Sequence, residues 1–353
     1  MRHRWIPVLI AGVALATPAF ALQSGEPAEL DTVLVVGEQP GPGLWKVSKE
    51  GHVLWILAAH RPLPQDLHWR TTEIEARIAA SQEVLYRGNV GIGANIGLLR
   101  GLTLVPAALR AAKLPEGRTL EDVLPADTWA TWRVLRERYL PKDKDVERLR
   151  PAIALERLRS AALRRNGLAG GPDVFEVVGR LRKKHKVKRH ALPEARRTLR
   201  VGNPRGLLKD AARLEVPELA CVVRALGTLE EDVLRERRRA EAWARGDIDT
   251  LRRLHRDLDA ERALQENCGG QLLQALAAGE GPEAARAKQL LDDALWHARW
   301  ASVQAENEWL DAARAALEKN ASTFAVLPLD DVLRADGPLS RLRAEGYEVE
   351  EPR

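Results

Sequence analysis

Two strand-like runs that meet through a tight turn constrain the fold more than any other stretch of this chain. Residues 44–49 and 52–58 are rich in Val, Ile, Leu and Trp, and residues 49–51 join them. We predict a β-hairpin with a three-residue loop, because the closing Gly51 takes a positive φ at little cost. The second strand must end by Pro62, since proline removes a backbone donor. In α/β proteins the chain that leaves a buried strand commonly carries the chemistry.

The N-terminus has the three parts of an export signal. Arg2 and Arg4 form a positively charged region, residues 6–16 form an apolar region, and residues 19–21 read Ala-Phe-Ala, a typical cleavage site. The apolar run is shorter than the roughly 18 residues of a transmembrane helix. We therefore expect cleavage after Ala21 and a periplasmic or secreted protein with no transmembrane span.

Charge and length narrow the class of protein further. Cleavage would remove Arg2 and Arg4 and lower the formal net charge from +5 to +3. A mildly basic exported chain without a dominant basic face is not expected to bind nucleic acid. About 330 residues remain, which predicts one large domain or a core with an insertion. We interpret residues 22–42 as a flexible leader and residues 43–353 as one domain with a helical insertion at about 205–280.

The only two cysteines are Cys221 and Cys268. In an oxidising compartment such a pair predicts a disulfide, and two buried thiols are the alternative. The bridge would close a loop of 48 residues, which the chain-entropy model values at roughly 4 kcal/mol. Neither cysteine has a second Cys or a His at zinc-finger spacing, so the pair predicts no metal site.

Hydrophobic periodicity predicts a mostly helical chain after the hairpin. A short strand is expected at residues 83–86, another at 187–192 and a third at 322–327. The Gly-rich residues 88–97 lack the third glycine of a dinucleotide-binding motif, because Ile96 stands in its place. We interpret them as a mobile surface loop. Helices are predicted at 71–81, 105–112, 127–139, 145–164, 174–181, 207–214, 218–244, 248–265, 283–319, 330–333 and 338–345.

The strongest basic run is residues 182–190, RKKHKVKRH. Cations suit the C-terminal end of a helix, so a solvated helix end is one interpretation. Contact with an anionic envelope polymer or a lipid headgroup is the other. His185 and His190 are poor candidates for metal ligands, because the neighbouring cations oppose the binding of another cation.

Both ends of the chain carry motifs of a known family. The sequence opens with LW-K-V, a second strand and LP before a Trp, and it closes with a strand, DG-x-L and GY-x-V. In these motifs it resembles the TraB/GumN (TraB/PrgY/GumN, Tiki-like) family from about residue 44 to 349. The resemblance implies an α/β (α+β) fold: a mixed β-sheet core that brings the N-terminal hairpin and the C-terminal strand together, with a large helical layer. The family is also thought to include metal-dependent hydrolases of the peptidase type.

Residues at the family's signature positions differ in this chain. Where the family has G-T-x-H after the second strand, the sequence has Ala58, Ala59, His60 and Arg61, so Arg61 replaces the expected His. His60 lies one position early, and a one-residue shift on a strand turns a side chain to the opposite face.

Three further signature positions are also changed. Tyr86 and Arg87 stand where the family has an acidic residue. Glu306-Asn307 replaces an Arg-Asn pair, so that only Asn307 is retained. No second His follows the last strand, where Asp330 and Asp331 stand instead. These aspartates are candidate oxygen ligands, although an exposed Asp pair that opens a helix commonly caps it.

Two functional hypotheses follow from these substitutions. The first is an exported, non-catalytic family member without a cofactor, which binds an envelope protein or an anionic polysaccharide in a cleft lined by Arg61, Tyr86 and Arg87. The second is a hydrolase that binds Zn²⁺ or Mn²⁺ through a shifted set, His60 with Asp330 or Asp331. A structural helper in exopolysaccharide export is a third idea, suggested only by the family's name.

Overall fold

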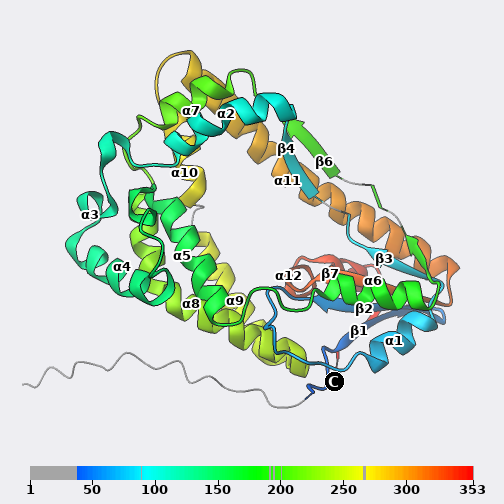
Figure 1. The fold of residues 1–353 in the computed structure, drawn as a ribbon. Coiled ribbons are helices and arrows are strands. Elements are labelled where there is room, and N and C mark those ends of the chain that lie inside the picture. Colours follow the sequence, from blue (N-terminus) through cyan, green and yellow to red (C-terminus); the bar gives the residue numbers. More distant parts are fainter. Residues whose placement is uncertain are drawn as a thin grey trace, which may run out of the picture. The chain divides into compact units, whose positions relative to one another are not determined.

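Six strands form the central sheet in the order β5-β3-β7-β2-β1-β8 (Figure 1). β2, β7, β3 and β5 are parallel neighbours, whereas β1 runs antiparallel to both β2 and β8. The predicted mixed sheet, with the hairpin beside the C-terminal strand, is confirmed. The strands are β1 (Leu44–Lys49), β2 (His52–Ala59), β3 (Glu83–Tyr86), β5 (Lys188–His190), β7 (Ser322–Pro328) and β8 (Glu348–Glu350).

This computed structural model describes residues 38–88, 90–190, 192–193, 195–199, 201–264 and 268–352. Residues Gly37–Arg353 form one compact unit. The predicted export signal and most of the predicted leader lie outside the described residues. Two positions at the end of that leader are hydrogen-bonded: the Gln39 amide donates to the His68 carbonyl at 2.8 Å, and the Gly41 amide donates to the Ala244 carbonyl at 2.9 Å.

The hairpin is closed by two residues, not by the predicted three. Lys49 still pairs with His52, so it belongs to β1. Glu50 and Gly51 form the loop with φ of 51° and 87°. A two-residue hairpin loop with positive φ at both positions matches the twist of the flanking strands. The loop prediction failed because Glu50, a residue that rarely adopts positive φ, shares the turn with Gly51.

Helices make up most of the rest of the chain, and the predicted ranges agree with them apart from their ends and a few short additional turns. The helices are α1 (Thr72–Ala79), α2 (Leu98–Ala111), α3 (Leu120–Val123), α4 (Ala126–Tyr139), α5 (Pro151–Arg165), α6 (Val174–Lys184), α7 (Pro204–Ala211), α8 (Leu219–Arg245), α9 (Ile248–Leu264), α10 (Cys268–Ala277), α11 (Pro282–Lys319), α12 (Leu329–Leu333) and α13 (Pro338–Ala344).

The Gly-rich segment predicted as a loop contains a strand instead. β4 (Val90–Ala94) pairs in parallel with β6 (Ala195–Leu199), and this pair forms a separate two-stranded sheet. The prediction was wrong because a β-ladder depends on its partner as much as on its own side chains. Here the partner lies about a hundred residues along the chain, and alternating glycines conceal the strand pattern.

Two hydrophobic cores stabilise the unit. The first surrounds the sheet and includes the apolar residues of β2, β7 and α6. The second lies among α4, α5 and α8. Helix α8 joins the two, because Val222 and Val233 pack in the helical core whereas Trp243 packs in the sheet core. The Trp243 Nε1 atom also donates to the Ala58 carbonyl at 2.6 Å. Helix α8 thereby connects the helical layer to the end of β2.

The cysteine prediction is tested only in part. Cys221 is buried in α8 and is not a free thiol. The side chain of Cys268 lies outside the described residues, so the bridge between the two stays a prediction. Within the described ranges, we find no helix that combines the length and the apolar character needed to cross a membrane.

Candidate functional site

The carboxyl ends of three parallel strands meet at one edge of the sheet. Ala59 of β2 lies beside Pro328 of β7, and Tyr86 of β3 lies beside Val326 of β7. The residues that leave these strands are therefore brought together from three distant parts of the sequence. In open α/β sheets this edge is where ligands bind.

A pocket of about 700 Å³ opens at this edge. That volume lies within the range of small-molecule sites. Among the described residues, its lining has five cationic side chains and only two carboxylates, so its electrostatic character is cationic. The lining residues are Arg61, Tyr86, Arg87, Gly88, Asp173, Phe175, Glu176, Gly179, Arg182, Lys183, Arg189, Ser302 and Pro328.

Helix α6 forms one wall of the pocket. Asp173 caps its N-terminus as predicted, since its Oδ1 accepts from the Phe175 amide at 2.7 Å and from the Glu176 amide at 3.4 Å. The buried Val174 and Val178 anchor the helix in the sheet core. The face of α6 that points away from this core therefore lines the pocket.

Arg61 projects into the pocket from the end of β2. Its side chain is 65% exposed, and its Nη1 lies 3.4 Å from Oδ2 of Asp173. The guanidinium also lies over the Phe175 ring, 5.1 Å from the centroid. A long contact with a capping carboxylate and a stacked aromatic face leave the guanidinium able to accept a further anionic partner.

Arg189 and Tyr86 form a second cationic corner. The Arg189 guanidinium lies 5.3 Å from the centroid of the Tyr86 ring. Burial raises the pKa of the Tyr86 hydroxyl, and nearby arginines partly oppose this rise. The hydroxyl is therefore neutral near pH 7, so it can donate a hydrogen bond to an anion.

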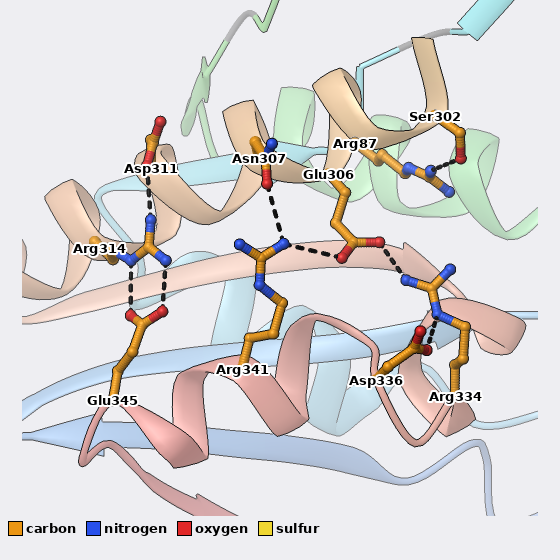
Figure 2. Close-up of polar contacts among 10 residues, drawn as sticks. All are labelled: Arg87, Ser302, Glu306, Asn307, Asp311, Arg314, Arg334, Asp336, Arg341 and Glu345. Carbon is orange, nitrogen blue, oxygen red and sulfur yellow. Dashed lines mark hydrogen bonds and ion pairs between the residues drawn. The ribbon is translucent and has the colours of Figure 1, made fainter. Parts of the chain in front are cut away.

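Arg87 leaves β3 beside the aspartate that follows β7. Its Nη1 donates to Oδ2 of Asp331, and its Nη2 lies 3.4 Å from the Ser302 hydroxyl (Figure 2). Asp331 is buried, so the interpretation of an exposed Asp pair that caps a helix is wrong for this residue. Burial raises the pKa of Asp331, whereas the positive charge of Arg87 lowers it.

His60 lies on the other side of the strand end. It is only 3% exposed, and its Nε2 has no hydrogen-bond partner among the described residues. Burial, together with the charge of Arg239, lowers its pKa from 6.5 to about 3, although Asp330 opposes this effect. The neutral form is thus maintained, and the predicted opposite facing of His60 and Arg61 agrees with the structure.

Asp330 belongs to this buried side rather than to the pocket. It forms an ion pair with Arg239, and its Oδ1 lies 3.4 Å from Nδ1 of His255. His60 and Asp330 are therefore close enough to interact electrostatically, whereas Asp331 faces Arg87. The predicted ligand set is divided between two sides of the edge.

The signature-equivalent Asn307 lies in a polar network that connects α11 with the C-terminal helices (Figure 2). Its Oδ1 accepts from Arg341 at 3.0 Å. The preceding residue, Glu306, forms ion pairs with Arg334 and Arg341. Arginines are therefore present beside Asn307 although Glu306 replaces the family's Arg, because other elements supply them.

The residues at this edge do not fit a hydrolytic divalent cation. Such a site needs several His or carboxylate ligands around one open position. The described part of the chain has no group of three or more His, Cys, Asp or Glu side chains placed to hold a metal ion. In addition, Asp330 and Asp331 are each paired with an arginine that a cation would have to displace.

Comparison with known proteins identifies the family. The model of the TraB/PrgY/gumN family matches residues 43–351. The chain belongs to this family. No curated protein and no solved structure matched it. Membership in the TraB/PrgY/gumN family accounts for the arrangement of the strand ends, and the side chains at those ends must be read from this chain itself.

Several pocket residues were predicted, and others were missed. The lining includes Arg61, Tyr86 and Arg87, as the first hypothesis expected, whereas Ala58 and Ala59 are buried in β2. The basic run supplies Arg182, Lys183 and Arg189, and its interpretation as an anion contact was the signal for them. Arg239 and His255 carried no local signal, because they reach Asp330 from α8 and α9.

Proposed function

We propose that this TraB/PrgY/gumN family member binds an anionic ligand of the cell envelope and does not catalyse metal-dependent hydrolysis. One observation carries the proposal: the pocket at the strand ends is lined by Arg61, Arg87 and three cations of the basic run. Charge-assisted hydrogen bonds from arginine to carboxylate or phosphate are among the strongest polar contacts in proteins. A cationic pocket in this position suits an anion in place of a metal ion.

Lys183 and Arg189 are the best residues for a test. They line the pocket, and they are exposed. Their replacement should therefore change ligand binding without loss of the fold. Each hydrogen bond to a charged group contributes roughly 1.5–3 kcal/mol. The double variant Lys183→Ala/Arg189→Ala should thus bind citrate or pyrophosphate at least tenfold more weakly than the unaltered protein in isothermal titration calorimetry.

Arg133 supplies the matched control. It is an exposed cation of α4 outside the pocket, so Arg133→Ala should leave both affinities within twofold. Added salt should weaken binding to the unaltered protein, since the contact is between charges. Equal affinity in the double variant, or an equal loss in Arg133→Ala, would contradict the proposal.

Export to the envelope is part of the proposal and rests on the sequence. The three-part N-terminal signal supports cleavage after Ala21. A disulfide between Cys221 and Cys268 would accord with an oxidising compartment. Mass spectrometry of the protein from a periplasmic or culture-medium fraction tests both points. The expected mass begins at residue 22 and increases by 2 Da when the protein is reduced; an uncut chain or an unchanged mass would contradict the corresponding point.

The hydrolase alternative has one favourable observation, the buried Nε2 of His60 beside Asp330. It predicts a stoichiometric Zn²⁺ or Mn²⁺ ion that is lost in His60→Ala. We expect elemental analysis of the untagged protein to find less than one-tenth of an equivalent of either metal in both proteins. A full equivalent that disappears in His60→Ala would overturn the non-catalytic proposal.

A further inference from the structure

Helix α6 contains a glycine that its packing does not explain. Gly179 lies in the middle of the helix, and a Cβ built on it would meet no atom within 4 Å. Glycine weakens a helix interior compared with alanine, because it loses more backbone freedom on folding. Neither a positive φ nor a close neighbour requires glycine here. The open space above Gly179 is the pocket itself.

A second hollow adjoins the pocket along the same helix. It has a volume of about 580 Å³ and shares Asp173, Glu176, Gly179 and Lys183 with the first. Arg180 also lines it. The two hollows therefore meet over Gly179, where the absence of a side chain allows a ligand to approach the helix backbone closely. A single small anion would occupy only one of them.

The charges along this path are mixed. Cations line both hollows, but Asp173 and Glu176 line both as well. A chain with a negative charge on every link, such as polyphosphate, would be repelled by these carboxylates. A chain that alternates anionic groups with hydroxyl donors would satisfy both kinds of lining, because hydroxyls donate to carboxylates and anions accept from arginine.

We infer that the ligand is an acidic oligosaccharide that crosses α6 over Gly179 and occupies both hollows. This inference rests on the proposed anion-binding function and adds the ligand's class, its extent and the residue that admits it. Sugar units carrying carboxylates contact Arg61 and Arg189 in the first hollow and Arg180 in the second, and their hydroxyls face Glu176. Affinity must then rise with chain length until both hollows are filled.

Oligogalacturonates of one to eight units are suitable probes, measured by calorimetry beside citrate. The octamer should bind at least tenfold more tightly than the monomer. Gly179→Leu keeps the helix favourable but places a side chain at the crossing. It should lower the octamer affinity at least tenfold and leave the citrate affinity within threefold.

Gly227 supplies the matched control. It lies within α8, is exposed, and also has no atom within 4 Å of a built Cβ. Because it is outside both hollows, Gly227→Leu should leave the octamer affinity within twofold. Circular dichroism of both variants checks that the helices are retained.

The outcomes separate this inference from the function beneath it. If citrate and all oligogalacturonates fail to bind, the proposed anion binding is wrong. If citrate binds but the octamer gains nothing over the monomer, or Gly179→Leu has no effect, only the crossing is wrong. Polyphosphate or poly-glutamate of equal length that binds as tightly as the octamer would overturn the oligosaccharide class.

Discussion

Two sides of one strand edge use charge in opposite ways. On the pocket side, Arg61 is 65% exposed and its only printed ion pair is a 3.4 Å contact with Asp173. On the buried side, the Arg239 side chain is 4% exposed and is paired with Asp330 next to the neutral His60. Charges with open space around them can receive a ligand, whereas charges that neutralise each other in the interior mainly hold elements together. Consecutive residues of the chain, His60 and Arg61, belong to different sides.

The largest effect is expected on the buried side, from Arg239→Ala. The change leaves Asp330 without its main partner and removes packed side-chain atoms. We expect the free energy of unfolding to fall by about 2–3 kcal/mol, below the roughly 3–5 kcal/mol for a pair with both partners buried. The reduction follows from the 40% exposure of Asp330. Urea denaturation measures the change, and a loss below about 0.5 kcal/mol would remove the contrast between the sides.

A pH dependence should come next. The pKa of His60 is about 3 in the folded chain and near 6.5 when unfolded, so the unfolded state binds the proton first as pH falls. Stability is therefore fully present above pH 6.5 and is lost as pH decreases towards 3. At 1.36 kcal/mol per pKa unit, this group should cost about 2 kcal/mol between pH 7 and pH 5.

His60→Leu isolates that contribution. The variant cannot titrate at this position, so its free energy of unfolding should fall by about 2 kcal/mol less between pH 7 and pH 5 than that of the unaltered protein. The difference between the two slopes cancels the contribution of other titrating groups. Parallel pH profiles would show that His60 is not kept neutral by its surroundings.

Arg61→Ala should separate function from stability on the pocket side. Because the side chain is largely exposed, its loss should change the free energy of unfolding by less than about 0.5 kcal/mol. Affinity for citrate should nevertheless fall roughly tenfold, since one charge-assisted contact is lost. Calorimetry and urea denaturation on the same preparation test both parts. A large stability loss with unchanged affinity would reverse the assignment of Arg61.

The smallest effect concerns the helix that forms the pocket wall. Gly179→Ala and Gly227→Ala should each raise the free energy of unfolding by about 0.5–1 kcal/mol, because both glycines lie in helices with open space for a Cβ. A rise in Gly227→Ala together with a loss in Gly179→Ala would show that the fold itself requires Gly179.

The local parts of the fold were open to prediction from the sequence. The hairpin, the cap at Asp173 and the strand before Tyr86 each depend on neighbouring residues, so periodicity and capping rules located them. The opposite facing of His60 and Arg61 followed from the alternation of side chains along extended chain. The loop conformation of Glu50 and the strand β4 were missed, because each depends on contacts that local pattern does not contain.

The site was predictable only on its strand side. Arg61 and Arg87 were located through the family's signature positions, and the basic run contributed Lys183 and Arg189. The pairing of Arg239 with Asp330 joins residues 91 positions apart. Nothing in either local sequence specifies that contact, so the electrostatic neutralisation of the buried side could not be foreseen.

The place of β7 in the sheet sets an order on the birth of this protein. It pairs with both β2 and β3, although it begins only at Ser322 of a chain of 353 residues. A nascent chain that lacks these last residues has no strand to join its two halves, and long-range pairing of this kind is slow. The ligand-binding edge therefore cannot assemble on the ribosome until synthesis is almost finished, and the unfinished chain stays loose long enough for a translocation machine to engage it.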